Sequence, residues 1–340
     1  NPRVFGLYGE GAEESLRRAG FDVHVWLMRD GERYKDLRSY SRLLSRLGEL
    51  TFTRTDAVVA LGGGVVGDIA GFAAASFLRG IRFLQVPTTL LAMIDSSVGG
   101  KTGINLESGK NLVGAFHQPA GVLMDVSTLR TLPRREVVAG YCEAVKHAVL
   151  SGGSLFEETR SHLSVVDTSR FKRVFESPDL IADIAEFVLK QAAFKASVVI
   201  GDQTEDVPRT DFRSRKVLNL GHTLAHSLEK VTAYRYFRHG EAVGWGLRFA
   251  GELSKSLELI HSDELNLLNH VVQLVGELPD ISKLDAESIV RSFASDKKNV
   301  TGKLQWVLLQ GIGSPVIVAS DQIPELSIRA CLDQLIKRTS

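Results

Sequence analysis

Short apolar runs alternate with amphipathic stretches over the first third of the chain. Val23–Leu27, Asp56–Leu61 and Phe83–Val86 are apolar runs rich in β-formers, which predicts three strands. Tyr40–Leu50 repeats apolar residues at helical spacing, and the small-residue segment Asp68–Phe77 follows a glycine turn, so both are predicted to be helices. A strand, a glycine turn, a helix and a second strand make a βαβ unit, which indicates an α/β domain with a mostly parallel sheet.

The pattern changes after Leu132-Pro133. Residues 134–300 carry long helical patterns with few strand candidates and few breakers, and Leu304–Leu309 is a β-rich piece near the end. We therefore predict a Rossmann-like parallel-sheet domain over residues 1–132, followed by a mainly α-helical domain over residues 133–340.

The composition is that of an ordinary globular protein. Of the 340 residues, 44% are hydrophobic and 24% are charged, and 41 basic residues face 40 acidic ones. This balance gives no overall field for nucleic acid or an anionic membrane, so neither is expected as a partner. No apolar run reaches the roughly 18 residues that a membrane span requires.

The cysteines and the start of the chain bear on its cellular setting. Cys142 and Cys331 are far apart and show no paired spacing, which disfavours a disulfide scaffold and a Cys-based zinc site and favours a reducing, cytoplasmic setting. Asn1–Val4 has neither the charged nor the long apolar region of a signal peptide. Because the sequence does not begin with Met, we expect further residues upstream.

A glycine-rich turn, Gly62–Asp68, follows a predicted strand and opens a predicted helix. Glycines there let the backbone approach a pyrophosphate, and the helix N-terminus offers free N–H groups. The spacing is not the usual GxGxxG, so a plain tight turn is the alternative. Asp68 is the best acceptor for a ribose hydroxyl, although it could instead cap the helix.

The next segment, Val86–Asn111, interleaves hydroxyls, a carboxylate, glycines and two lysines with apolar residues. Gly99–Thr102 resembles the end of a P-loop, but Asp95 and Ser96 stand where the first glycine of that motif is required, which disfavours an ATPase. Lysines beside paired glycines favour an anionic or hydroxylated ligand, and a polar loop between core elements is the alternative.

A polar stripe runs along Arg215–Val231 if the segment is one helix. At about 100° per residue, Arg215, Asn219, His222 and His226 fall on one face and apolar side chains on the other. A solvated face is the alternative, but solvated helix faces more often carry Glu and Lys than Arg, Asn and His. Two histidines at i and i+4 can also share a metal.

Two further residues could join a metal site. Glu143 and His239 stand in similar polar contexts, and the spacing leaves open which set of residues binds. Glu143 and Lys146 also form an i, i+3 pair, which on most helices is an ordinary surface ion pair.

Taken together, these residues resemble the dehydroquinate synthase family over nearly the whole chain, from Gly31 to Lys298. The most specific stretches are Gly62–Lys101, Gly109–Pro119 and Leu218–His226. The resemblance implies a divalent metal, zinc first and cobalt second, with three protein ligands and open positions for substrate. Its metal ligands would be Glu143, His222 and His239.

The resemblance also implies NAD, a sugar phosphate substrate and a homodimer in which Arg79 acts across the interface. The residues implied for NAD are Glu32, Lys35, Gly63, Gly64, Asp68, Thr88, Thr89, Asp95, Lys101, Lys110, Thr128 and Thr131. The residues implied for substrate are Asp95, Lys101, Asn111, Lys146, Lys195, Glu205, Arg215, Asn219, His226 and Lys298.

Two of these assignments stay open. Asp206–Ser214 makes the stretch before Arg215 several residues longer than is usual in the family, which puts in doubt Glu205 and the choice among Arg209, Arg213 and Arg215. At the phosphate, Lys298 is favoured over Lys297 without excluding it.

The implied reaction is a ring closure with no net oxidation. NAD⁺ would transiently oxidise one alcohol of 3-deoxy-D-arabino-heptulosonate 7-phosphate, phosphate would leave, and re-reduction, ring opening and an aldol step would follow. Three alternatives remain: another sugar phosphate cyclase, such as one of the 2-epi-5-epi-valiolone synthase type, a polyol dehydrogenase of similar fold, and an inactive binding protein. Lys101, Asn111, Lys195 and Arg215 together favour a substrate that carries a carboxylate.

Overall fold

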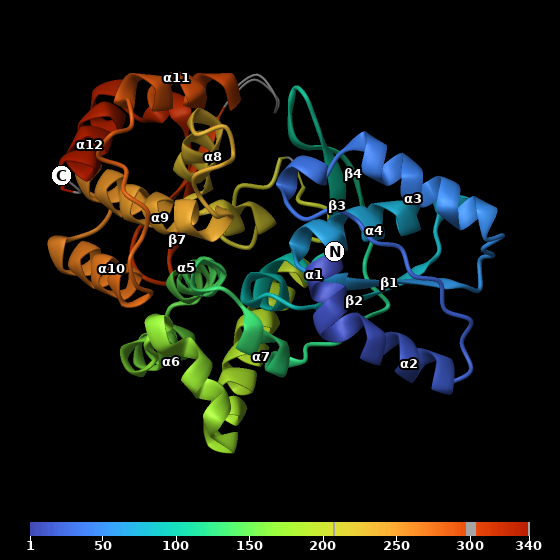
Figure 1. Cartoon of the computed structure of the whole chain (residues 1–340). Coiled ribbons are helices and arrows are strands. Elements are labelled where there is room, and N and C mark those ends of the chain that lie inside the picture. The colour runs from blue at the N-terminus through green and yellow to red at the C-terminus, as the bar shows by residue number, and fades with distance from the viewer. Residues whose placement is uncertain (207, 297–303, 339–340) are drawn as a thin grey trace. The chain divides into compact units, whose positions relative to one another are not determined.

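The computed structural model describes residues 1–206, 208–296 and 304–338 (Figure 1). The chain divides into two compact units. Unit 1 comprises Asn1–Leu132 with Pro178–Ala185, and unit 2 comprises Pro133–Ser177 with Glu186–Ser340. The assignment of NAD to the first domain, and of metal and substrate to the second, stays a prediction.

Unit 1 contains most of the strands. Its elements are α1 (Pro2–Val4), α2 (Glu10–Arg18), α3 (Leu37–Glu49), β1 (Ala57–Gly62), α4 (Gly64–Ser76), β2 (Arg82–Pro87), β3 (Lys101–Leu106), β4 (Gly109–Phe116) and β5 (Gly121–Val122).

Unit 2 is mainly helical. Its elements, with α7 beginning in unit 1, are α5 (Arg134–Ser151), α6 (Gly153–Val165), α7 (Pro178–Gly201), α8 (His222–Val231), α9 (His239–Ser256), α10 (Ser262–Leu274), α11 (Ala286–Asp296), β6 (Gln305–Leu309), β7 (Pro315–Ala319) and α12 (Glu325–Lys337).

The sheet of unit 1 is parallel, in the order β1-β2-β5, with Ala57 opposite Arg82 and Gly62 opposite Pro87. β3 and β4 form a separate antiparallel pair. The predicted strands at 56–61 and 83–86 and the predicted helices at 40–50 and 68–77 are all present within a few residues. The expected parallel-sheet fold followed by a mainly helical part is therefore confirmed.

The predicted strand at Val23–Leu27 is wrong. The segment is not part of any sheet among the described residues, and the carbonyl of Val23 accepts a hydrogen bond from Arg17 at 2.6 Å. Trp26 of this segment and Met28, just after it, pack on the core, while Val25 and Leu27 stay exposed. β-formers favoured an extended backbone here, but a strand also needs a neighbouring edge with which to pair.

Helix α4 owes its small residues to close packing on the sheet. A Cβ at Gly67 would lie 2.4 Å from Gln85 Oε1, and one at Gly71 would lie 2.5 Å from Thr102 Cγ2. On its other side α4 packs Ile69 and Ala73 against Leu43 and Leu47 of α3. The core of unit 1 therefore lies between α3, α4 and the strands.

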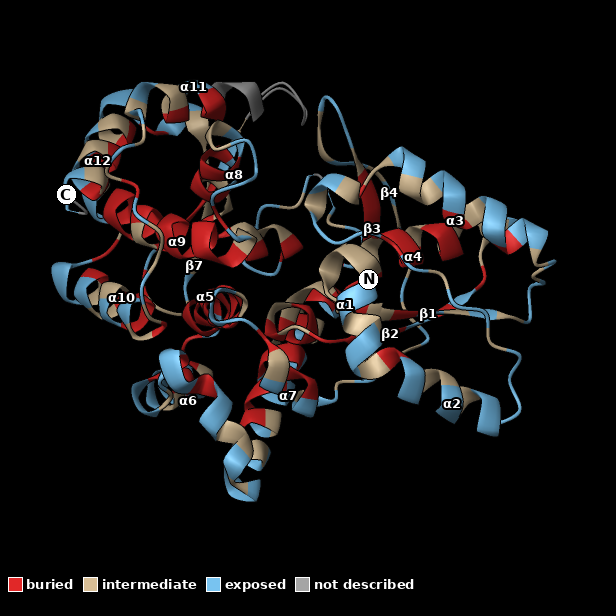
Figure 2. Cartoon of the chain, in the orientation of Figure 1, coloured by how far each residue is buried: buried red, intermediate tan, exposed pale blue. Residues whose placement is uncertain are grey.

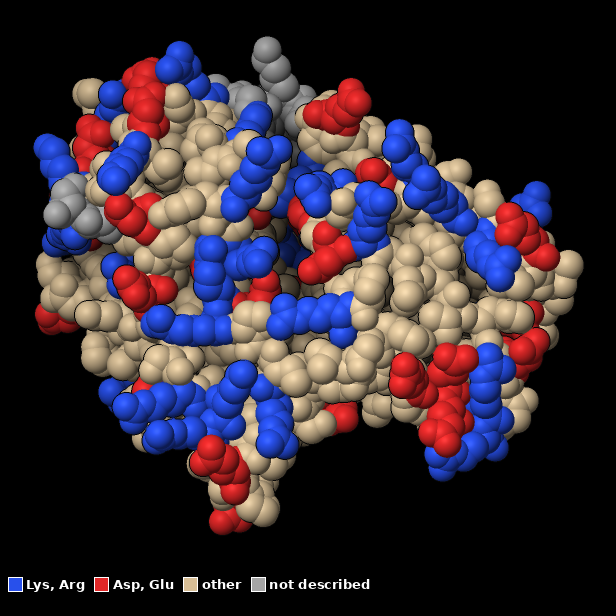
Figure 3. Space-filling model, in the orientation of Figure 1, with Lys and Arg blue, Asp and Glu red and all other residues tan. Residues whose placement is uncertain are grey.

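Helix α2 has the character of a solvated surface helix. Its acidic and basic side chains lie side by side in Figure 3, and Arg17 and Arg18 form i, i+4 ion pairs with Glu13 and Glu14 at 2.8 and 2.5 Å. Exposed pairs of this kind stabilise a helix by only about 0.3–0.5 kcal/mol each.

Unit 2 is built around α5 and α9, which Figure 2 shows buried along almost their whole length. Their buried positions are filled mainly by small and apolar residues, together with a few charged side chains such as Glu143 of α5 and Glu241 of α9. Neither they nor any other helix in the described part of the chain is long and apolar enough to cross a membrane.

Candidate metal and nucleotide sites

Two glycine contacts bring three helices of unit 2 together. Gly240 of α9 lies so close to α5 that a Cβ there would stand 1.9 Å from the carbonyl oxygen of Ala139. Gly221, with φ of +80°, precedes α8, and its carbonyl oxygen lies 1.9 Å from where a Cβ of Gly246 on α9 would stand. His239 directly precedes Gly240, and His222 directly follows Gly221. The sequence therefore places one imidazole beside each contact.

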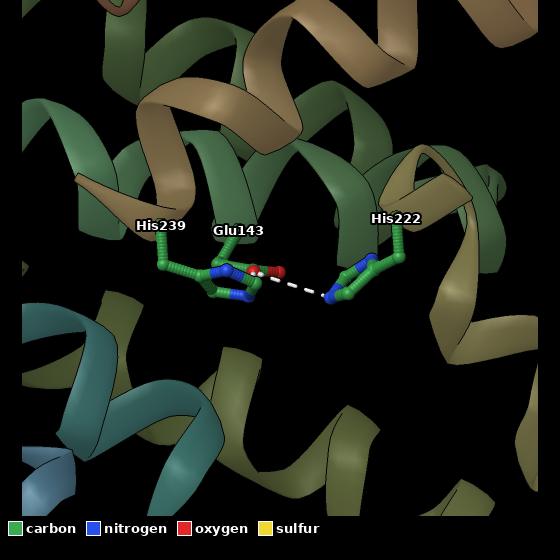
Figure 4. A group of neighbouring side chains, drawn as sticks. All are labelled: Glu143, His222 and His239. Atoms are coloured by element: carbon green, nitrogen blue, oxygen red, sulfur yellow. Dashed lines mark ion pairs between the residues drawn. The ribbon is translucent and has the colours of Figure 1, made fainter. Parts of the chain in front are cut away.

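Glu143 of α5 lies between these two imidazoles (Figure 4). Its Oε1 is 3.4 Å from His239 Nε2 and 3.8 Å from His222 Nε2. One ligand atom from each of the three residues lies within 4.8 Å of the other two. The carboxylate is buried and both rings are partly covered. This is a set of one oxygen and two nitrogen donors that a zinc or cobalt ion accepts.

Both imidazoles are also oriented by a second contact. His222 Nδ1 lies 3.2 Å from the carbonyl oxygen of Leu220, and His239 Nδ1 lies 3.5 Å from the buried carboxylate of Glu229. Partners of this kind set the ring tautomer and leave Nε2 free for a metal. The sequence analysis missed Glu229, which lies seven residues after His222, two turns along α8.

The charges around the cluster favour neutral imidazole. Burial, together with the charge of Lys146, holds the pKa of His222 well below its ordinary value. Lys146 Nζ lies 2.6 Å from Glu143 Oε2, and each of these side chains is only 2% exposed. The Glu143–Lys146 pair is therefore a buried pair within the candidate site, and not the ordinary surface pair that its spacing also allowed.

The prediction of one helix over Arg215–Val231 is wrong. Arg215–Asn219 is a 3₁₀ segment, and α8 begins only at His222, after the left-handed Gly221. Glycine is what permits that break, since the conformation is strained for other residues. His226 nevertheless lies near the cluster, with its ring centroid 5.5 Å from that of His222 and 6.2 Å from that of His239.

The long segment before Arg215 is organised by Asp202. Its carboxylate accepts hydrogen bonds from the backbone amides of Asp206 and Arg215, each at 2.8 Å. Burial alone would raise the pKa of Asp202, but these two bonds, the charge of Arg209 and a hydrogen bond from Ser214 together outweigh it, and the pKa is lowered.

Among the three candidate arginines, Arg215 is the buried one. Its side chain donates to the carbonyl of Gln203 at 2.7 Å, whereas Arg209 pairs with Asp211 at 2.9 Å and Arg213 is exposed. Oε1 of Glu205 lies 3.5 Å from the side-chain nitrogen Nδ2 of Asn219.

In unit 1, the glycine turn after β1 lies against the predicted threonines. Gly63 precedes α4, and a Cβ there would stand 3.2 Å from Thr89 Cγ2. Thr88 donates its backbone N–H to the carbonyl of Gly62 at 3.0 Å. A Cβ at Gly64 would stand 2.9 Å from Ser96 Oγ, next to Asp95. The two glycines therefore let Thr89 and Ser96 pack directly against the start of α4, which places the predicted threonines beside the N-terminus of that helix.

A second group of predicted residues in unit 1 is joined by Asn105, which the sequence analysis did not single out. Its side chain donates to Glu32 Oε1 at 2.8 Å and accepts from the backbone N–H of Asn111 at 2.9 Å. Its own N–H donates to the carbonyl of Lys35 at 2.8 Å. Lys35 is buried and bonds to both Asp68 and the side chain of Asn111.

The remaining predicted residues are placed as follows. Lys110 Nζ lies 3.9 Å from Glu32 Oε1. Tyr8 donates its hydroxyl to the carbonyl of Thr128 at 2.9 Å, and its oxygen lies 2.6 Å from Thr131 Oγ1. Lys101 begins β3 and is exposed.

Three predicted residues complete the placement. Lys195 is buried in α7, Arg79 is exposed, and Lys298, like Lys297, lies outside the described residues.

Solved structures with this fold include two sugar phosphate cyclases. One is 2-deoxy-scyllo-inosose synthase complexed with carbaglucose-6-phosphate, NAD⁺ and Co²⁺, with a TM-score of 0.77 and 29% identity over 92% of this chain and 82% of that chain. The other is ValA, a 2-epi-5-epi-valiolone synthase from Streptomyces hygroscopicus subsp. jinggangensis 5008 with NAD⁺ and Zn²⁺ bound. Its TM-score is 0.86 at 25% identity, over 99% of this chain and 89% of that chain.

Among sugar phosphate cyclases, the amino-acid sequence matches one family. Models of the N-terminal and C-terminal parts of 3-dehydroquinate synthase match residues 25–139 and 140–299. The 3-dehydroquinate synthase of Nostoc punctiforme is 42% identical over 335 residues, which cover 98% of this chain and 87% of that protein. The chain belongs to the 3-dehydroquinate synthase family.

Proposed function

We propose that the chain converts 3-deoxy-D-arabino-heptulosonate 7-phosphate into 3-dehydroquinate and inorganic phosphate, as a carbon–oxygen lyase of the shikimate pathway in the cytoplasm. The observation that carries this is the convergence of Glu143, His222 and His239 in a chain 42% identical to a 3-dehydroquinate synthase.

NAD is the first cofactor we assign. The two cyclase structures hold NAD⁺. In this chain Gly63 and Gly64 form the turn between β1 and the N-terminus of α4, and Lys35 and Asp68 supply polar groups of the kind that a dinucleotide needs. Bound NAD supplies a transient oxidation of one substrate alcohol and its later reversal. Because the hydride is returned, the overall reaction is a rearrangement with loss of phosphate.

A divalent metal is the second. Glu143, His222 and His239 supply three donors, which leaves coordination positions for oxygens of the substrate. The ion, zinc or cobalt, supplies Lewis-acid polarisation of the alcohol that is oxidised. Lys146 balances the charge of Glu143 and lies within one turn of it, where it can also meet a substrate oxygen.

The buried cations of unit 2 are assigned to the substrate. Lys146, Lys195 and Arg215 are 2%, 6% and 2% exposed, and a cation attracts a carboxylate or phosphate more strongly in a buried site than in water. A substrate with both a carboxylate and a phosphate supplies two such anions. Asn219 and His226 would hold its hydroxyl groups and pass protons, which fixes the chain near its reactive geometry.

The active assembly is proposed to be a homodimer in which Arg79 reaches the partner's substrate. Leu78, Arg79 and Gly80 have φ angles of 49°, 65° and 118°, so two non-glycine residues in succession are strained. Strain of this kind costs about 1–3 kcal/mol per residue and is kept where a side chain must be presented. Arg79 is exposed at this turn.

A substrate panel tests the proposed activity. The chain loaded with NAD⁺ and zinc is incubated with heptulosonate phosphate, sedoheptulose 7-phosphate or glucose 6-phosphate, and phosphate release is measured. We expect that only heptulosonate phosphate is turned over, because it is the one substrate of the three with a carboxylate for Arg215 and Lys195 to bind. Preferred turnover of either sugar that lacks the carboxylate would identify another cyclase.

A further inference from the structure

A bidentate ion pair joins the starts of the two central helices of unit 2. Arg135 Nε donates to Glu241 Oε1 at 2.7 Å, and its Nη2 donates to Oε2 at 2.5 Å. The same Nη2 donates to the carbonyl of Tyr236 at 2.7 Å, and Glu241 also accepts the backbone N–H of Arg238 at 2.8 Å. The Glu241 side chain is 2% exposed and that of Arg135 is 51% exposed.

This pair joins the two helices that carry Glu143 and His239. Glu241 follows His239 by two residues at the start of α9, and Arg135 is two turns before Glu143 on α5. The first residue of a helix is the most prone to fray, since its N–H groups lack partners within the helix. Glu241 caps that turn and Arg135 ties it to α5, so the pair restrains His239, whose side chain is 36% exposed.

We propose that Arg135 and Glu241 are positioning residues that hold His239 beside Glu143 so that both can bind one metal ion, an inference that rests on the proposed metal-dependent function. Neither side chain touches the metal or the substrate in this account. The bidentate geometry matters, because a guanidinium fork fixes both the distance and the rotation of a carboxylate, and an ammonium group fixes only the distance.

The same helix offers a matched control. At the other end of α9, the buried Glu252 pairs with Arg338, and these side chains are 6% and 54% exposed. The Arg338–Glu252 pair therefore has the same residue types and nearly the same burial as the Arg135–Glu241 pair, but it lies far along the helix from His239. A purely structural role would make the two pairs behave alike.

The experiment follows zinc affinity in the full chain. Zinc-loaded wild type, Arg135→Ala, Arg135→Lys, Glu241→Gln, Arg338→Ala and Glu252→Gln are each titrated with a chromophoric chelator, and NAD affinity and thermal midpoint are measured in parallel. We expect Arg135→Ala and Glu241→Gln to weaken zinc binding by about 10–100-fold, the range for groups that orient a ligand. Arg135→Lys should lose less, the control variants should keep wild-type zinc affinity, and NAD affinity should not change.

The double variant adds a test of coupling. If both side chains act through one contact, Arg135→Ala with Glu241→Gln should bind zinc no more weakly than the worse single variant. Wild-type zinc affinity in Arg135→Ala would overturn the proposal. If Arg135→Ala does not fold, wild-type zinc affinity in Arg135→Lys would overturn it. So would equal losses in the Arg135 and Arg338 variants. If the wild type binds no zinc, or if the Glu143→Ala variant binds zinc as tightly as the wild type does, the proposed metal site itself is contradicted.

Discussion

Glu143 connects the candidate ligands to one another and to Lys146, because its two carboxylate oxygens face both imidazoles and the ammonium group. The donors come from three helices and are up to 96 residues apart in the sequence (Glu143 to His239). Their convergence therefore reports the packing of the helices around them, and replacing one donor tests the site at its smallest scale.

Replacing Glu143, His222 or His239 by Ala should each abolish metal retention while NAD binding stays measurable. Glu143→Ala should also lower the free energy of unfolding by about 3–5 kcal/mol, because it removes one member of the buried ion pair with Lys146. Metal content after gel filtration, and an anomalous-scattering map of crystals, measure the effect. Full metal occupancy in any of the three variants would show that the ion binds elsewhere.

Asn105→Ala should weaken NAD binding about tenfold without changing metal affinity. The side chain makes two hydrogen bonds that fix Glu32 and Asn111, and each such bond contributes roughly 0.5–1.5 kcal/mol. Titration calorimetry with NAD⁺ measures the change, and Thr53→Ala, which removes an exposed side-chain hydrogen bond in the same unit, serves as the control. Unchanged NAD affinity in the Asn105 variant would show that the cluster of Glu32, Asn105 and Asn111 is not part of the nucleotide site.

At the scale of helices and strands, two glycine contacts determine where the imidazoles stand. Gly240 and Gly246 of α9 touch the backbones of Ala139 and Gly221, so α9 is held against α5 on one side and against the start of α8 on the other. Close backbone approach of this kind is possible only without a Cβ. His222 and His239 are therefore placed by the chain itself, ahead of any bound ion.

Gly240→Ala should separate α9 from α5 and weaken metal binding at least tenfold. The added Cβ would meet a backbone carbonyl, which cannot rotate away, and overpacking typically costs about 1–3 kcal/mol. Gly48→Ala is the control, because Gly48 lies in α3 with open space around it and should stabilise the protein slightly. A Gly240 variant with wild-type zinc affinity and stability would contradict this packing.

The elements that the sequence predicted correctly are those with a strong local signal. The β1–α4–β2 unit could be read from alternating composition and a glycine turn, and β6 from its β-rich residues. The strand predicted at Val23–Leu27 failed because pairing depends on a distant edge, and the single helix over Arg215–Val231 failed because Gly221 takes a left-handed conformation. Periodicity describes one element at a time and carries neither kind of information.

The site could be predicted only in part for a related reason. Resemblance to a family marked Glu143, His222 and His239, which the structure brings together, while spacing alone left several sets open. Asn105, Glu229 and the Arg135–Glu241 pair were missed, since each acts through contacts between segments remote in sequence. A residue whose role is to orient another has no motif of its own.

For the whole molecule, we expect a dimer in which each active site is shared between the two subunits. Arg79→Ala should weaken substrate binding about 10–100-fold, the loss expected for a charge-assisted hydrogen bond, while sparing NAD and metal affinity. Mixing Arg79→Ala subunits with subunits inactivated by Lys146→Ala should restore activity, because one site of the hybrid would then be intact. Arg18→Ala, an exposed arginine of α2, is the control.

Hybrid dimers are separated by charge tags and confirmed by mass spectrometry. Recovered activity near half of the wild-type value per dimer is the expected result. Hybrids that show no more activity than either parent would mean that Arg79 acts within its own subunit or not at all.

The central claim is that this chain uses NAD without consuming it while it expels phosphate. The most direct test incubates the purified chain with heptulosonate phosphate, zinc and a small, known amount of NAD⁺, and follows phosphate and absorbance at 340 nm together. We expect many phosphates to be released per NAD⁺ with no accumulation of NADH. NADH rising in step with phosphate, or with no phosphate at all, would identify a dehydrogenase and contradict it.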